Sequence, residues 1–425
     1  PVLMTNFTSF IKENILYLTI LTLLLHFLKD NFSEYYFFIV LMMMISFLII
    51  YKDRKIYKLE LDKNIIFFYA VFLIALFYVG LISIISNQRF NLDYMLIIVA
   101  LGKIYISPLI VILVVFLAKH RYDYNSLLKI YTLIILLAVL SILLQNFFGH
   151  IPFFGQTYYH EARYGVLGYS SITGSVNSYG LCFSLATLFI FFNKKIGNFT
   201  KSILIFLLFF GAILSMSKSS FINIGLLITV MFFSNFKLRN NWNFFIYLII
   251  FFILSFIFIK FFQDAFTGLF IHTTGIEIFD KKINEEKYFN IFAAALERVS
   301  LRWGFPGNFS SYDFLFGIGV FAGGASLGFE HQVSSHNAIY DMYFIGGPLL
   351  LISFLSLAII IQYRLYKIFK ISNYNDELSI IFFISNNILL FNSLFFTNAF
   401  FHPVISFGFY LSIGYLLTYK IYYKQ

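Results

Sequence analysis

The chain has 425 residues, of which 60 % are hydrophobic and only 12 % are charged. Soluble proteins carry about 25 % charged residues, so this composition excludes an ordinary soluble enzyme. The formal net charge is +10. Because Lys and Arg gather in the connections between apolar runs, we interpret this excess as membrane topology and expect no nucleic-acid partner. The single cysteine, Cys182, excludes an internal disulfide.

Apolar runs long enough to cross a hydrocarbon layer of roughly 30 Å follow one another along the chain. We predict about twelve spans, near residues 15–28, 35–51, 64–86, 94–118, 130–148, 179–192, 202–217, 219–234, 243–262, 337–362, 379–397 and 403–419. The predicted fold is an all-α polytopic membrane protein, with residues 1–425 as one integral membrane domain.

Charge distribution predicts the orientation of these spans. Most Lys and Arg residues lie near the termini or in the connections that follow even-numbered spans. By the positive-inside rule, both termini are then cytoplasmic. Two outer connections are longer than the rest: residues 149–178, whose polar, glycine-bearing sequence could be re-entrant, and residues 263–335, a long loop with short helices before the third-last span.

The long loop contains a predicted helix over residues 291–303. On it, Arg298 and Arg302 are four residues apart and share one face. Guanidinium groups bind phosphate oxygens in a bidentate fork, so this pair could grip a diphosphate without a metal. The alternative is that one of them merely pairs with an acid such as Glu297 or with lipid headgroups.

Arg163 and Lys218 are two further cations on the predicted outer face. Arg163 lies in the first long connection beside Glu161, with which it could simply pair. Lys218 lies in a serine-rich turn between two spans, where the positive-inside bias disfavours a cation. A cation there needs an anionic partner or ligand, and the alternative is snorkelling to lipid phosphates.

His336 precedes Asn337 and Tyr340 where the long loop re-enters the membrane, as a helix expected to continue through residues 346–348. Imidazole titrates near neutral pH, so His336 could take a proton from an attacking sugar hydroxyl. The alternative is a histidine that satisfies local hydrogen bonds. His402, at another outer helix mouth, is a weaker candidate for the same role.

Several kinds of chemistry lack support in the sequence. It contains no GxxxxGK[ST] phosphate loop and no HExxH helix, which argues against nucleotide hydrolysis and zinc proteolysis. The first outer connection offers only Asp30 and Glu34 as acids, and the acids of the long loop are scattered. We therefore expect neither a metal nor another cofactor.

Four segments together resemble the bacterial O-antigen polymerases of the Wzy type and the related O-antigen ligases. They are Arg163 to Gly174 with residues 175–177, the turn at 214–220, Arg298 to Trp303 with residues 317–319, and the Ser-His-Asn start of the next helix with residues 346–347. The motif-level likeness covers residues 160–350. It departs at Lys218, where ligases and many relatives have Arg, and in the long loop, where the arginine-to-glycine spacing does not distinguish Arg298 from Arg302.

The resemblance implies a GT-C type glycosyltransferase in the bacterial inner membrane, with its active site facing the periplasm. Its substrates would be undecaprenyl-diphosphate-linked oligosaccharides, joined by metal-independent, inverting transfer. His336 would deprotonate the acceptor hydroxyl. The cations Arg163, Lys218, Arg298 and Arg302 would hold the donor diphosphate, with Glu161, Asn177, Asn337, Tyr340 and His402 as secondary candidates.

Membrane lipids and a polysaccharide chain-length regulator are further partners that the resemblance admits. Two alternatives remain at this point. One is an O-antigen ligase, which transfers glycan to lipid A core. The other is a lipid-linked oligosaccharide flippase, which needs charge along a passage through the helices, whereas the candidate cations here gather at one predicted membrane face.

Overall fold

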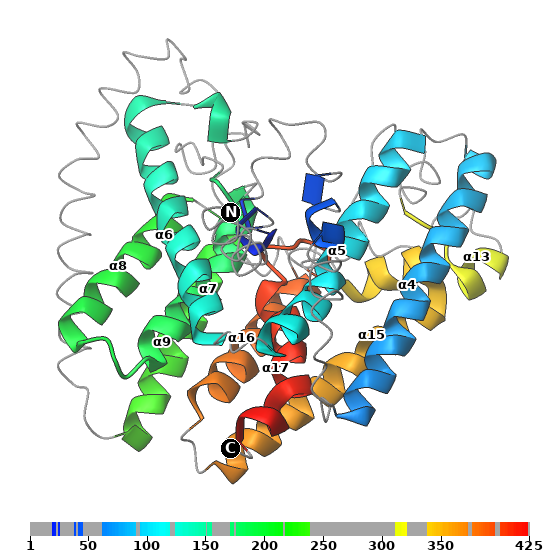
Figure 1. Cartoon of the computed structure of the whole chain (residues 1–425). Helices are drawn as coiled ribbons and strands as arrows, with labels where there is room; N and C mark the ends of the chain where they lie inside the picture. The colour runs from blue at the N-terminus through cyan, green and yellow to red at the C-terminus, as the bar shows by residue number, and fades with distance from the viewer. Residues whose placement is uncertain are drawn as a thin grey trace, which may run out of the picture. The chain divides into compact units, whose positions relative to one another are not determined.

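The computed structural model describes residues 19–22, 24–25, 38–39, 41–45, 62–90, 94–119, 124–149, 151–154, 171–173, 176–215, 217–238, 311–320, 338–372, 376–395 and 400–423. Within these ranges the chain is helical and has no strand. The helices, shown in Figure 1, are α4 (Lys63–Phe90), α5 (Tyr94–Lys119), α6 (Tyr124–Phe148), the short η1 (Pro152–Phe154), α7 (Val176–Phe192), α8 (Asn198–Leu214), α9 (Lys218–Leu238), α13 (Ser311–Phe316), α15 (Ala338–Ile371), α16 (Glu377–Phe395) and α17 (Phe407–Tyr423).

Apolar helices confirm that this is a helical, multi-pass membrane protein. In the described part of the chain, four helices are long and apolar enough to cross a bilayer: Lys63–Ile85, Tyr124–Phe148, Ala338–Ile371 and Glu377–Leu394. Shorter apolar helices lie at Ser178–Phe192, Asn198–Leu214 and Ser219–Phe232. The count of about twelve spans stays a prediction, because the spans predicted near 15–28, 35–51 and 243–262 lie wholly or mostly outside the described residues.

The other predicted spans each coincide with a helix, although some helices extend beyond the apolar run. Helix α6 begins at Tyr124 instead of near residue 130, and α15 continues to Ile371 instead of ending near 362. Hydropathy marks only the part of a helix that faces hydrocarbon. Polar residues such as Gln, Arg and Lys are good helix formers, so the backbone stays helical after the apolar pattern ends.

The described helices belong to two compact units, one formed by residues Pro1–Ile130 and Ser300–Gln425 and the other by Tyr131–Val299. In the first unit, α4 and α15 form an antiparallel pair (Figure 1). An ion pair of 3.3 Å between Asp62 and Arg364 joins the start of α4 to the last turns of α15. Nearer the middle of this pair, the rings of Phe72 and Phe354 are 6.2 Å apart.

Helix α17 is the most deeply packed element of the first unit, since residues 403–418 are buried throughout. Its last turns meet the starts of two other helices. Tyr415 donates a hydrogen bond to the carboxylate of Asp376, the residue before α16. Thr418 shares a hydrogen bond of 2.7 Å with Tyr124, the first residue of α6. Helix α17 therefore runs antiparallel to α16.

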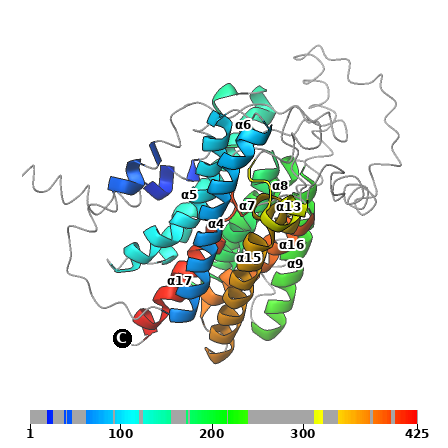
Figure 2. The same cartoon turned by 90° about the vertical axis from the view of Figure 1, so that its right-hand side faces the viewer.

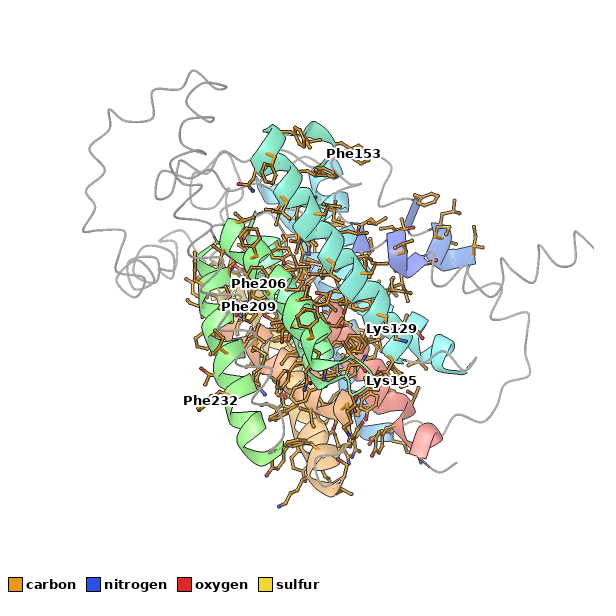
Figure 3. All side chains as sticks on the ribbon, turned by 90° about the vertical axis from the view of Figure 1, so that its left-hand side faces the viewer. Lys129, Phe153, Lys195, Phe206, Phe209 and Phe232 are labelled. Carbon is orange, nitrogen blue, oxygen red and sulfur yellow. The ribbon has the colours of Figure 1, made fainter. Side chains whose placement is uncertain are left out.

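The second unit is built around α7, in which every residue from 178 to 192 is buried. Helix α8 runs antiparallel to α7. At one end Tyr179 donates a hydrogen bond to the Leu208 carbonyl (2.9 Å), and at the other Lys201 Nζ donates to the Phe191 carbonyl (2.9 Å). Figure 3 labels Phe209 of α8, which is buried, and Phe232 of α9, which is 40 % exposed.

Helix α15 continues through residues 346–348, as the sequence predicts, but it is kinked there, one quarter of the way along its length. Gly346 (φ −132°, ψ 16°) and Gly347 (φ 63°, ψ −162°) have non-helical backbone conformations. Pro348 follows them and has no N–H to donate to the preceding turn. Proline with two glycines is a sufficient physical cause for such a break.

Candidate functional site

The structure describes four of the predicted site residues at least in part. The other six predicted site residues lie outside the described residues: Glu161, Arg163, Arg298, Arg302, His336 and Asn337. Asn177 and Lys218 are placed through their backbones, near or at the starts of α7 and α9. Tyr340 and His402 are placed with their side chains. The site can therefore be built upward from α7 and α9, where two of the predicted motif segments end.

Helices α7 and α9 are parallel, and their starts lie side by side. Asn223 donates a hydrogen bond of 2.7 Å from Nδ2 to the Gly180 carbonyl, and both residues are buried. A Cβ atom on Gly180 would lie only 2.9 Å from Ser219 Oγ and 3.1 Å from Ser220 N. Glycine is thus required for this approach, as is common where membrane helices pack closely. The contact brings the backbones of the Asn177 and Lys218 segments to the same end of the unit.

The turn between α8 and α9 is held by its own serines, all of which are buried. Ser215 Oγ donates to the Ala212 carbonyl (2.8 Å) and is 2.8 Å from Ser220 Oγ. Ser217 Oγ and Ser219 Oγ are hydrogen-bonded at 2.7 Å. These bonds bridge the last turn of α8 and the first turn of α9, so they set the position at which Lys218 begins its helix.

The chain that leads from the first long connection into α7 is also anchored. Ser171 and Thr173 share a hydrogen bond of 2.6 Å, and both are buried. The N–H of Ile172 donates to Ser141 Oγ on α6 (3.3 Å). The segment just before α7 is therefore seated on α6, within the same unit.

The electrostatics at this end of the second unit favour an anion. The N-terminal end of a helix carries a partial positive charge, and here two such ends lie side by side. Moreover, no Asp or Glu occurs anywhere between Glu161 and Asp264 in the sequence. The helices α7, α8 and α9 thus contain no carboxylate that could neutralise Lys218, whose backbone begins α9.

Tyr340 and His402 belong to the first unit and have clear local contacts. Tyr340 is half-buried in the first turn of α15, with its ring 4.3 Å from the ring of Phe344. The carbonyl of His402 accepts hydrogen bonds from the N–H (2.9 Å) and the Oγ (2.8 Å) of Ser406, just before α17. These contacts give both residues a structural role at helix starts.

The sequence-based selection missed the hydroxyl and amide groups around Lys218. Ser219 and Ser220 precede Asn223 by four and three residues, which places each of them on the same side of α9 as Asn223. That spacing was a readable signal in the sequence. The helices approach each other here through small side chains, which carry no charge to mark them as a candidate site.

Among the described residues, no three His, Cys, Asp or Glu side chains gather as they would around a metal ion. Comparison with protein-family models and with curated proteins finds no match for this chain. The function must therefore be inferred from the residues and from the geometry at the starts of α7 and α9.

Proposed function

We propose that this protein polymerises undecaprenyl-diphosphate-linked oligosaccharide repeat units into O-antigen or a related surface polysaccharide. The acceptor hydroxyl would attack the anomeric carbon of the donor sugar and lose its proton to His336. The bond between that carbon and the diphosphate oxygen would break, releasing undecaprenyl diphosphate. Attack from the face opposite the leaving group would invert the anomeric configuration, without a metal.

The observation that carries the proposal is the meeting of α7 and α9 at their starts. The arginine-glycine segment leads into α7, and the serine-lysine turn leads into α9; both carry the resemblance to Wzy-type polymerases. Two adjacent helix N-termini, a lysine and no carboxylate on these helices make a suitable environment for a diphosphate. A developing negative charge on a leaving diphosphate would be stabilised there.

In this mechanism the predicted residues have separate tasks. Lys218 would hold the donor diphosphate from the start of α9, and Arg163 would approach it from the connection that precedes α7. Arg298 and Arg302 would supply further guanidinium groups from the long loop. His336 is the proposed general base, two residues before α15 begins at Ala338. The bacterial inner membrane, with this end of the helices toward the periplasm, is the proposed location.

Purified protein in lipid nanodiscs, supplied with an undecaprenyl-diphosphate-linked repeat unit, tests the proposal. We expect a ladder of longer glycans together with released undecaprenyl diphosphate. Lys218→Gln should abolish most of the ladder, whereas Lys218→Arg should retain it because the charge is kept. Lys195→Gln is the matched control, since Lys195 is exposed in the turn between α7 and α8, at the opposite end of α8.

Other outcomes would redirect the proposal. A wild-type protein that forms no ladder but transfers glycan to lipid A core would be a ligase. Movement of the lipid-linked substrate across the bilayer, with no new glycosidic bond, would indicate a flippase. A ladder that survives Lys218→Gln and His336→Ala unchanged would refute the residue assignments even if polymerisation itself is confirmed.

A further inference from the structure

Residues 311–320 form a compact element on the first unit, made of α13 and an extended segment, residues 317–320, which we call the strap. Four consecutive N–H groups of this element donate to acceptors in the protein. Gly317 N donates to the Asp313 carbonyl (2.9 Å), Ile318 N to the Phe344 carbonyl (2.8 Å), Gly319 N to the Ile345 carbonyl (3.0 Å) and Val320 N to Ser83 Oγ (3.0 Å). The N–H groups of the strap therefore need no water.

The break in α15 supplies the acceptors for the strap. In a regular helix, the N–H of residue 348 would donate to the carbonyl of residue 344. Pro348 has no N–H and cannot make this bond to Phe344. The N–H of Ile318 in the strap donates to this carbonyl instead. The close approach of the strap depends on glycine, because a Cβ on Gly317 would lie 2.6 Å from Gly347 N. A Cβ on Gly319 would lie 2.6 Å from Ser83 Cα on α4. The strap is thus wedged against the backbones of α4 and α15.

On helix α13, the apolar side chains of Tyr312, Leu315 and Phe316 face outward and the acid faces inward. Tyr312 is 61 % exposed, Leu315 65 % and Phe316 38 %, whereas Asp313 is only 4 % exposed. The rings of Tyr312 and Phe316 are 4.4 Å apart. This arrangement is the reverse of what a water-facing helix shows, because a water-facing helix buries its apolar residues and exposes its charges.

The exposed face of α13 is continuous with the apolar surface of the neighbouring membrane helices. Tyr78 of α4 donates a hydrogen bond to the Phe316 carbonyl (3.3 Å). Its neighbours on α4, Phe77 and Leu81, are 65 % and 49 % exposed, as is expected of residues that face lipid. Leu349, just after the break in α15, is also exposed. In Figure 2, α13 lies across the outside of α15.

We propose that α13 and the strap form a membrane-seated element. In it, Tyr312, Leu315 and Phe316 contact the lipids of the leaflet nearer the C-terminal end of α4. Irregular backbone is tolerated at membrane depth only where its polar groups are satisfied within the protein, and the strap meets this condition for every N–H. Lipid is favoured over a protein partner because the exposed face carries no charge and continues the lipid-facing surface of α4. Tyrosine is also a common residue at the membrane interface.

Spin labelling in lipid nanodiscs tests this proposal, independently of any enzymatic activity. Cys182 is buried and is the only cysteine, so a Cys182→Ala background allows single labels at Leu315→Cys, Phe77→Cys and Lys195→Cys. Collisions with oxygen report lipid exposure, and collisions with a water-soluble nickel chelate report water exposure. We expect the oxygen-to-nickel ratio at Leu315 to be close to that at Phe77 and several-fold higher than at Lys195.

Two results would overturn the proposal. A ratio at Leu315 as low as that at Lys195 would place α13 in water, and low accessibility to both reagents would mean that protein covers it.

A milder change gives a second measurement in case Leu315→Cys disturbs the fold. Tyr312→Trp, with Trp242 and Trp303 replaced by Phe, should be quenched more by lipids brominated near the headgroup than by lipids brominated near the chain end. Absence of quenching by both lipids would also refute the proposal.

Discussion

Replacing Gly317 by alanine should destabilise the first unit strongly, because both the backbone conformation and the surroundings of this residue require glycine. Its φ is +79°, in the left-handed region. The new Cβ would lie 2.6 Å from Gly347 N and 2.9 Å from Gly346 C. Both contacts are with backbone atoms, which cannot rotate away as a flexible side chain could.

The magnitude follows from two costs. A left-handed conformation costs a non-glycine residue about 1–2 kcal/mol, and overpacking in a tight interior costs about 1–3 kcal/mol. A shift of the strap would also weaken its hydrogen bonds to the Phe344 and Ile345 carbonyls, each with a net value of about 0.5–1.5 kcal/mol. We therefore expect a loss of about 3 kcal/mol or more in the free energy of unfolding.

Thermal unfolding in detergent, monitored by size-exclusion chromatography of the protein that stays folded, measures this effect. At about 2–4 °C per kcal/mol for a large domain, Tm should fall by roughly 6 °C or more. Gly102→Ala is the matched control, because Gly102 lies inside α5 with no atom within 4 Å of its added Cβ. Alanine there should be neutral or stabilising by up to about 1 kcal/mol. An unchanged Tm for Gly317→Ala, or equal losses in both variants, would refute the reasoning.

The other predictions concern one buried contact in the second unit and one ion pair in the first, and the same thermal assay measures both. Asn223→Ala removes the donor to the Gly180 carbonyl and should cost about 1–3 kcal/mol. Thr229→Ala, which removes an exposed hydroxyl bonded within α9, should stay within about 0.5 kcal/mol of wild type, and equal losses would contradict the assigned role of Asn223. Asp62→Ala should cost more than Arg364→Gln. Asp62 both pairs with Arg364 (3.3 Å) and accepts a hydrogen bond from the N–H of Asn64 at the start of α4 (3.0 Å). The expected difference between the two variants is therefore about 1 kcal/mol, the value of an N-cap. A larger loss for Arg364→Gln than for Asp62→Ala would contradict this prediction.

Much of the helical architecture could be predicted from the sequence, because the signal for it is local. The runs at 64–86 and 94–118 are long, apolar and bounded by polar residues, and each coincides with a helix, α4 and α5. The ends were less accurate: α15 continues nine residues past the predicted end near 362, to Ile371. Its last turns contain Arg and Lys, which form helix well but give no hydropathy signal.

The element at residues 311–320 could not have been predicted in the same way. Its partners are distant along the chain: Val320 and Ser83 are separated by 237 positions, and Phe316 and Tyr78 by 238. A periodic pattern in one segment carries no information about a hydrogen bond that another segment will supply. The glycines and the proline of residues 346–348 were visible and do predict a break in a helix, but not which segment fills it.

At the candidate site, the residues with recognisable chemistry and the residues that hold the helices together differ for a physical reason. Charged side chains such as Lys218 were selected because their chemistry can be named from one position. The described contacts that hold the segments together use small residues, since glycines such as Gly180, Gly317 and Gly319 allow helix and strap backbones to approach closely. In a membrane, close approach also brings polar backbone groups together and hides them from lipid. Small residues beside a serine-rich turn or a proline are therefore the better sequence guide to where segments meet, and charged residues the better guide to what the meeting place could bind.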